Sequence, residues 1–311
     1  MFIDTGSATV LIDTGPNSSV LEFLEGRGVD SVDLVIISHA DQDHVGGLST
    51  MLSNGVEVRR ILWNSDGLKH TGLWRSLCYQ LDDLEIEGAT RASEEISAGM
   101  SIEGLGDRLR IQVLAPRTRL RRLGVGGEDK SGARIGSNSV SAVVRLFLDD
   151  EPIVVIPGDL DDVGLAHLSD PEMPEMRAKY LVLPHHGGRM ANTPDATATA
   201  LSALIRAVEP QGVFVSNGRT TRMDNPREEV LGAVRVAAPS ATITCSQLSK
   251  TCAPLAVARE DSTESYSAGW SRGHACAGTI PLTRREAIES HQLFVDTQVA
   301  NPRCRAECSE G

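Results

Sequence analysis

The chain has 311 residues, with 30 Lys and Arg against 42 Asp and Glu, so its formal net charge is −12. Apolar residues make up 41% of it and aromatic residues 4%. This composition excludes a disordered or fibrous protein, and the acidic balance argues against a protein that coats long nucleic acid by charge alone. A nuclease is not excluded, because bound metal ions supply local positive charge that the count ignores.

The sequence gives no sign of a membrane or export segment. No stretch approaches the roughly 20 apolar residues that cross a bilayer. The first residues carry Asp4 and lack a basic segment, so they do not resemble a signal peptide. We therefore expect a cytoplasmic protein with no membrane partner.

The apolar pattern predicts alternating strands and helices. In chain order we expect a strand over 8–12, a helix over 20–25, a strand over 34–37, a helix over 45–53, a strand over 60–63, a helix over 70–81, strands within 96–114, paired strands over 140–148 and 153–156, a strand over 180–183, a helix over 196–208, a strand over 213–216 and a helix over 226–236. Such alternation is typical of an α/β fold with layered sheets. The sequence becomes polar and turn-rich after residue 240, so we predict a main domain over 1–240 and a small Cys-containing C-terminal extension over 241–311.

Four potential metal ligands follow the predicted strand over 34–37. His39, Asp41, Asp43 and His44 lie within six residues, directly before two glycines. The carboxylates would repel one another unless a cation compensated them, and a metal ion resolves that conflict. The alternative is a solvated turn in which Asp41 or Asp43 only caps the next helix.

Two other predicted strands end in the same way. Asp159 follows the strand over 153–156, and His185 and His186 follow the strand over 180–183, each close to a glycine. Taken alone, Asp159 could be a helix cap, and the histidines could be partly buried loop residues. Three strand ends with ligand-type residues together predict a metal site.

These motifs carry a family resemblance. The order LIDTG, SHADQDHVGG, PGDL and LPHHGG resembles the metallo-β-lactamase superfamily, in particular the hydrolase domain of the ComEC/Rec2 competence proteins and their free-standing relatives. Asp41 stands where most of the superfamily has the second histidine of HxHxDH. The resemblance spans about residues 8–236. It implies an αββα sandwich with metal ions at one edge, and a strand before residues 8–12 that the sequence pattern does not show.

The resemblance also implies roles for individual residues. His39 and Asp41 would hold one metal ion, Asp43 and His44 a second, and Asp159 would bridge both. His185 or His186 would lie at the edge of the site, and Asp13 would orient a ligand histidine. Asn138 belongs to an Asn-Ser element that is typical of this branch. Where relatives have a last ligand histidine this chain has Asn225, a weaker oxygen ligand, although Asp224 could substitute.

Ligand chemistry indicates the metal and the reaction. Asp41 makes the site richer in oxygen, which favours Mn²⁺ or Mg²⁺ while Zn²⁺ remains an alternative. Two divalent ions with three carboxylates leave about one positive charge, which attracts an anionic substrate. We predict phosphodiester hydrolysis by a metal-activated bridging hydroxide, with Asp43, His185 and His186 as catalytic residues and a nucleic acid as substrate. The alternatives are a hydrolase of lactones, β-lactams, thioesters or cyclic nucleotides, and a weakly catalytic metal-binding module of a larger assembly.

Two further features stand apart from these motifs. Residues 116–137 form a long, basic, Gly-rich connection, in which Arg119, Arg121 and Arg122 either grip substrate phosphates or belong to a solvated loop. Near the C-terminus, a structural zinc could bind a set of four cysteines: Cys245, Cys252, Cys276 and Cys304. Disulfides or inert thiols are the alternatives.

Overall fold

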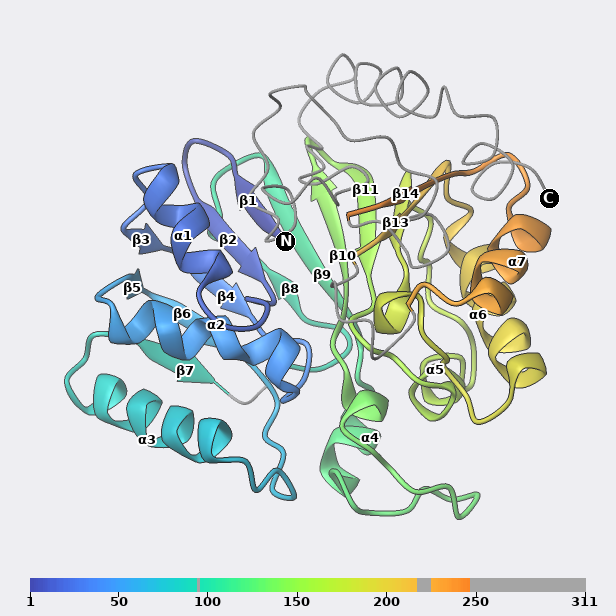
Figure 1. The fold of residues 1–311 in the computed structure, drawn as a ribbon, viewed down its shortest axis with the longest axis horizontal. Helices are drawn as coiled ribbons and strands as arrows, with labels where there is room; N and C mark the ends of the chain where they lie inside the picture. The colour runs from blue at the N-terminus through green and yellow to red at the C-terminus, as the bar shows by residue number, and fades with distance from the viewer. Residues whose placement is uncertain (94–95, 217–224, 247–311) are drawn as a thin grey trace. The chain divides into compact units, whose positions relative to one another are not determined.

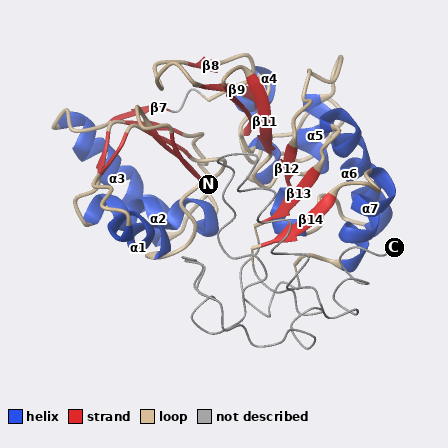
Figure 2. Cartoon of the chain, turned by 90° about the horizontal axis from the view of Figure 1, so that it is seen from above, coloured by secondary structure: helices blue, strands red, loops and turns tan. Residues whose placement is uncertain are grey.

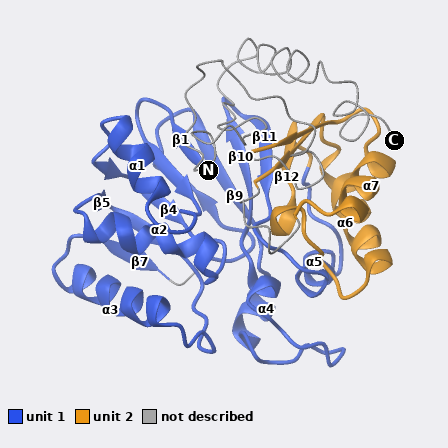
Figure 3. Cartoon of the chain, viewed as in Figure 1, with its two compact units in different colours: residues 1–176 blue, residues 177–311 orange. Residues whose placement is uncertain are grey.

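The computed structural model describes residues 1–93, 96–216 and 225–246. The chain forms two compact units, Met1–Met176 and Arg177–Gly311 (Figure 3). The predicted boundary near residue 240 stays a prediction, because nearly all of the proposed extension lies outside the described residues. None of the helices in the described ranges is long and apolar enough to span a bilayer.

A five-stranded sheet forms one half of the first unit. Its order is β1 (Phe2–Asp4), β2 (Thr9–Ile12), β4 (Leu34–Ile36), β6 (Arg60–Leu62) and β7 (Arg91–Ser93). β1 pairs with β2 antiparallel, and the other neighbours are parallel. A two-stranded ladder of β3 (Ser31–Val32) and β5 (Glu57–Val58) accompanies it.

Three helices cover one face of this sheet (Figure 1): α1 (Ser19–Gly26), α2 (Gln42–Ser53) and α3 (Gly72–Ile86). Leu11, Val35 and Ile61 are successive cross-strand neighbours, and all three pack in the core that these helices share with the sheet. Leu34 and Ile36 point to the opposite face and are also fully buried. Burial on both faces explains why β4 is apolar at every position.

The other half of the first unit is an antiparallel sheet. Its order is β8 (Ser101–Ile102), β9 (Leu109–Ala115), β10 (Val143–Leu148) and β11 (Glu151–Ile156). Three short helices flank these strands: α4 (Thr118–Leu123), the 3-10 helix η1 (Asn138–Val140) and α5 (Asp162–Leu168). Asp161 caps α5 by accepting a hydrogen bond from the Gly164 amide at 2.8 Å.

The second unit is built on parallel strands. β12 (Tyr180–Val182), β13 (Gly212–Val215) and β14 (Thr242–Cys245) pair in that order, with α6 (Pro194–Val208) and α7 (Glu228–Ala237) packed against each other beside them (Figure 2). The 3-10 helix η2 (Pro184–Gly187) follows β12. The chain is thus an α/β protein, as the alternating pattern predicts.

Three local predictions were wrong. A strand does precede residues 8–12, because β1 is only three residues long and too short to show a period. The connection over 116–137 contains α4, whose single buried apolar residue is Leu120. Residues 140–142 are not part of β10, because η1 ends at Val140 and β10 begins at Val143. In addition, α2 begins at Gln42, so Asp43 and His44 lie in its first turn rather than in a loop.

Candidate metal centre

Strand ends bring the central residues of the site together. β2 and β4 are parallel, so Asp13 and His39, which follow them, lie at the same edge of the sheet. Asp159 arrives from the loop after β11. Gly158 permits this approach: its φ is +54°, and a Cβ there would lie 2.3 Å from Ser141 Oγ and 2.7 Å from Ser38 Cβ.

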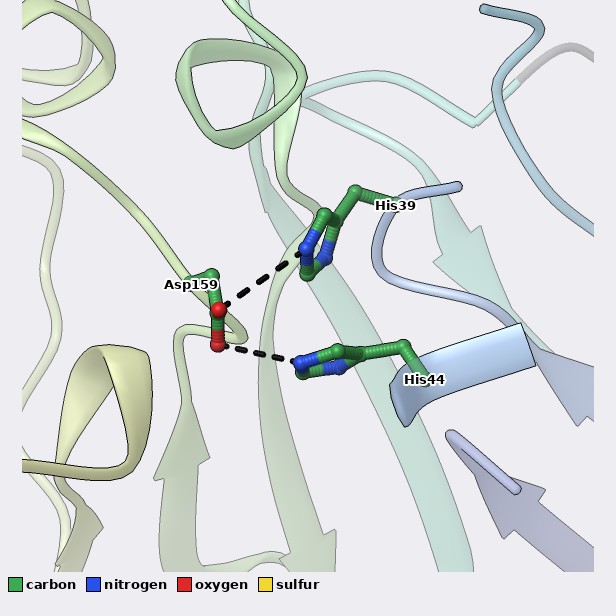
Figure 4. Close-up of side chains that lie close together, drawn as sticks. All are labelled: His39, His44 and Asp159. Carbon is green, nitrogen blue, oxygen red and sulfur yellow. Dashed lines mark ion pairs between the residues drawn. The ribbon is translucent and has the colours of Figure 1, made fainter. Parts of the chain in front are cut away.

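His39, His44 and Asp159 form a buried cluster (Figure 4). Their exposed fractions are 2%, 4% and 4%. Asp159 lies between the two imidazoles, with Oδ1 at 3.1 Å from His44 Nε2 and Oδ2 at 3.8 Å from His39 Nε2. The Ser141 hydroxyl accepts a hydrogen bond from the backbone amide of Asp159 at 3.1 Å, which fixes the backbone at Asp159.

Asp13 and Ser38 orient the imidazoles from behind. Asp13 Oδ2 lies 2.8 Å from His44 Nδ1 and 2.9 Å from the Ser38 hydroxyl, and Oδ1 accepts the Ser38 amide at 2.7 Å. Ser38 Oγ also lies 3.0 Å from His39 Nδ1. With Nδ1 held in this way, His44 presents Nε2 to the cluster.

The charges of the cluster shift the pKa values of its members. Burial alone would lower the pKa of His44, but the charge of Asp13 and hydrogen bonds to Asp13 and Asp159 raise it to about 11. Burial would raise the pKa of Asp13, yet the His44 charge and hydrogen bonds from His44 and Ser38 hold it below its usual value. The pKa of His39 is lowered by burial and by the charge of His44. Both effects favour the neutral form of the His39 imidazole.

The donor set fits a divalent metal ion. His39 Nε2 is buried and has no hydrogen-bond partner within the part of the chain that the structure describes. It lies 3.8 Å from both Asp159 Oδ2 and Asp41 Oδ2, too far for a hydrogen bond. Two ligand atoms about 2.1 Å from one ion and about 110° apart lie about 3.4 Å from each other. The spacing is thus close to that of ligands around one ion.

Asp41 and Asp43 lie at the start of α2. Asp41 is the N-cap residue, yet its side chain makes no capping hydrogen bond. Its Oδ1 instead accepts a hydrogen bond from Lys69 Nζ, while Oδ2 faces His39. Asp43 is exposed, and a carboxylate oxygen of it lies within 4.8 Å of a His44 ring nitrogen.

The paired histidines belong to the second unit. His185 and His186 both have positive φ, 53° and 55°, in η2, a conformation that costs energy in non-glycine residues. His186 Nδ1 lies 2.6 Å from the Ser216 carbonyl oxygen, which accepts a hydrogen bond from it. Asn225 Nδ2 donates to the His185 carbonyl at 3.2 Å. The roles of these residues at the metal centre stay predictions, and Asp224 lies outside the described residues.

The basic connection is tied to neighbouring elements. Arg119 donates to Asp170 Oδ2 at 2.6 Å and to His167 Nδ1 at 3.2 Å, and Lys130 donates to the same Asp170 oxygen at 3.0 Å. Arg121 is half-buried and Arg122 is exposed. These contacts attach α4 to the end of α5, and phosphate binding by Arg119, Arg121 and Arg122 stays a prediction.

The predicted roles of Asn138 and of the C-terminal cysteines stay predictions. Asn138 is half-buried and begins η1, whose next residue, Ser139, donates to Asp161 Oδ2 at 2.7 Å. Cys245 is buried at the end of β14. The other cysteines of the predicted zinc site lie outside the described residues: Cys252, Cys276 and Cys304.

Sequence reasoning missed Ser38, Ser141 and Lys69. Ser38 is next to His39 in the sequence. A serine between a buried strand and a ligand histidine is a pattern from which its role could have been predicted. Ser141 and Lys69 carry no such signal, because each reaches the site from a distant part of the chain.

Comparisons with known proteins identify distant relatives of the chain. The chain is 24% identical over 216 residues to ComE operon protein 3 of Bacillus subtilis, covering 68% of this chain and 23% of that protein. It is 23% identical over 241 residues to competence protein ComA of Neisseria gonorrhoeae, covering 76% and 28%. The chain thus spans about a quarter of the length of these relatives. Among solved structures, the metallo-beta-lactamase fold protein YhfI of Bacillus subtilis is 14% identical with a TM-score of 0.47, covering 78% of this chain and 87% of that one.

The family model of the metallo-beta-lactamase superfamily matches residues 1–187, which include the buried cluster and the strands that carry it. With distant homology to two competence proteins and a cluster that fits a metal ion, the chain belongs to the metallo-β-lactamase superfamily.

Proposed function

We propose that this chain is a metal-dependent phosphodiesterase that cleaves nucleic acid. The observation that carries the proposal is the excess of carboxylates around the buried imidazoles. Asp159 lies between His39 and His44, and Asp41 occupies a position where most of the superfamily has histidine. Oxygen-rich ligand sets suit Mn²⁺ or Mg²⁺, the ions commonly used for phosphoryl chemistry. Homology to two competence proteins is consistent with a nucleic-acid substrate.

The proposal gives each side chain of the site a separate role. His39, Asp41, Asp43, His44 and Asp159 would hold two divalent ions, within the αββα arrangement that the superfamily implies. Such ions make a water molecule nucleophilic at neutral pH and stabilise the leaving oxygen. Asp13 keeps a proton on His44 Nδ1 so that Nε2 stays available as a ligand. His185 or His186 would donate a proton to the leaving oxygen.

A substrate panel tests the proposal. Metal-free protein receives Mn²⁺ or Zn²⁺ and is incubated with single-stranded DNA, double-stranded DNA, RNA, cyclic dinucleotides and a chromogenic β-lactam. We expect cleavage of nucleic acid, reduced at least about a hundredfold in Asp43→Ala and Asp159→Asn, since both variants remove charged ligands. Asp149→Asn is the matched control, because Asp149 pairs with Arg108 at an exposed turn.

The outcomes separate the alternatives. Cleavage of nucleic acid that persists in Asp159→Asn would overturn the proposal. Hydrolysis of the β-lactam without nucleic-acid cleavage would assign the site to another hydrolase class. Full metal loading without turnover of any substrate would favour a binding module.

A further inference from the structure

A lysine from a separate loop contacts a predicted metal ligand. The loop between β6 and α3 carries Lys69, whose ammonium donates to Asp41 Oδ1, 28 residues away in sequence. The second oxygen of the same carboxylate faces His39 Nε2 at 3.8 Å. Asp41 therefore uses one oxygen for the cluster and the other for the lysine.

The ion pair lies on the solvent side of the cluster. The side chains of Lys69 and Asp41 are 23% and 35% exposed, whereas that of Asp159 is 6% exposed. Both groups of the ion pair are thus more accessible to a molecule in water than the buried imidazoles of His39 and His44. The long stem of Lys69 is mostly covered, which restricts where the charge can move.

The loop that carries Lys69 is fixed by a buried carboxylate. Asp66 is 4% exposed, and its Oδ1 accepts the Leu68 amide at 3.1 Å. Its Oδ2 accepts a hydrogen bond from the Ser137 hydroxyl, and its carbonyl accepts the Lys69 amide at 3.0 Å. A buried carboxylate is costly unless hydrogen bonds compensate it, so this arrangement holds the loop in one conformation. The position of the ammonium is thereby set in advance.

We propose that Lys69 binds the anionic oxygen of the substrate, and so selects charged phosphodiesters. This inference rests on the proposed function. Bound metal ions would already attract an anion, and the fixed ammonium of Lys69 adds a positive charge beside Asp41 that a neutral ester cannot use. An ammonium has three N–H donors, so Lys69 can keep Asp41 and still bind a phosphoryl oxygen. A lysine acts on phosphate as a compact point charge.

Two esters with the same leaving group test whether Lys69 recognises charge. Bis(para-nitrophenyl) phosphate carries a negative charge, and diethyl para-nitrophenyl phosphate carries none. For Lys69→Met we expect kcat/KM for the diester to fall about ten- to hundredfold, mainly through KM, because a charged hydrogen bond is lost. The neutral triester should be affected within about fivefold, the scale of a partly exposed ion pair.

Two variants serve as controls. Lys69→Arg should retain most of the activity on the diester because it keeps the charge. Arg108→Met removes another cation that is paired with an aspartate, Asp149, and should behave as wild type. Calorimetry with Mn²⁺ alone shows whether Lys69→Met still binds metal, and we expect an affinity within about fivefold of wild type.

Binding of inorganic phosphate to the Mn²⁺-loaded protein gives a measurement that does not depend on turnover. We expect Lys69→Met to bind phosphate at least about tenfold more weakly than Arg108→Met. If the wild type cleaves no nucleic acid in the substrate panel, the proposed function fails, and the phosphate titration still decides the role of Lys69.

Three results would overturn the inference. The first is that Lys69→Met matches Arg108→Met with both the diester and phosphate. The second is an equal loss on the diester and the triester. The third is a loss explained entirely by weaker Mn²⁺ binding, which would make Lys69 a positioning residue that acts through Asp41.

Discussion

Asp13 decides which nitrogen of His44 faces the cluster. Its two oxygens accept from the Ser38 amide, the Ser38 hydroxyl and His44 Nδ1. Both oxygens are thus used as acceptors, and the negative charge keeps the imidazole basic. Asp13 is not among the predicted metal ligands, yet through His44 Nδ1 it controls which nitrogen of His44 can bind a metal ion.

Asp13→Asn should weaken metal binding about ten- to hundredfold. Asparagine has one acceptor oxygen, so either the Ser38 amide or His44 Nδ1 loses its partner, and the charge is also lost. Calorimetric titration with Mn²⁺ measures the effect. Asp33→Asn is the control, because Asp33 accepts from Thr9 and Arg59 at the far end of the same sheet. Equal affinities in the two variants would contradict this role for Asp13.

At the scale of elements, a close contact joins α2 to the end of β2. The Thr14 hydroxyl accepts the Leu48 amide at 2.9 Å and donates to the His44 carbonyl at 2.9 Å. These two backbone groups would bond directly in a regular helix. Thr14 thus fixes the first turn of α2, and with it His44, to the sheet edge that carries Asp13.

The two glycines of α2 should respond differently to alanine. A Cβ at Gly47 would lie 2.4 Å from the Thr14 carbonyl oxygen and 2.6 Å from Val20 Cγ1, so Gly47→Ala should destabilise the protein by about 1–3 kcal/mol. At Gly46 the nearest atom would be Pro16 Cα at 3.4 Å, and Gly46→Ala should be neutral or stabilising by up to about 1 kcal/mol. Urea unfolding measures the free energy of unfolding of both variants. Equal changes in this free energy would contradict the close contact at Gly47.

At the scale of the whole molecule, metal binding should be coupled to stability. The chain carries a net charge of −12, and several of its carboxylates converge on the cluster. In the metal-free state the protonated imidazole of His44 partly compensates them. A divalent ion supplies more positive charge at the same place, and it binds the folded state alone because the unfolded chain has no such site.

Adding Mn²⁺ to metal-free protein should therefore raise its Tm. At a free concentration of a hundred times Kd, the gain in unfolding free energy is about 2.7 kcal/mol, or several degrees for a chain of this size. Asp159→Asn should lose most of the shift, whereas Asp149→Asn should keep it. Scanning calorimetry with and without EDTA measures both, and an unchanged shift in Asp159→Asn would remove this residue from the site.

Much of the fold could be read from local patterns. The apolar runs that become β4 and β11 end at His39 and Asp159, and strand ends tend to collect functional side chains. Short elements escaped prediction for the same local reason. β1 has three residues and α4 has one buried apolar side chain, so neither shows a period that rises above its surroundings.

The amino-acid sequence by itself determined the fold class, the family and the ligand-type residues, because these depend on periodicity and on spacing within a few residues. Only the tertiary structure decided that Asp159 lies between His39 and His44, that Ser141 and Ser38 hold them, and that Lys69 pairs with Asp41. Those contacts join segments far apart in the chain, and their distances depend on how the sheets pack and on where glycine lets two backbones approach. Local sequence carries no measure of that packing.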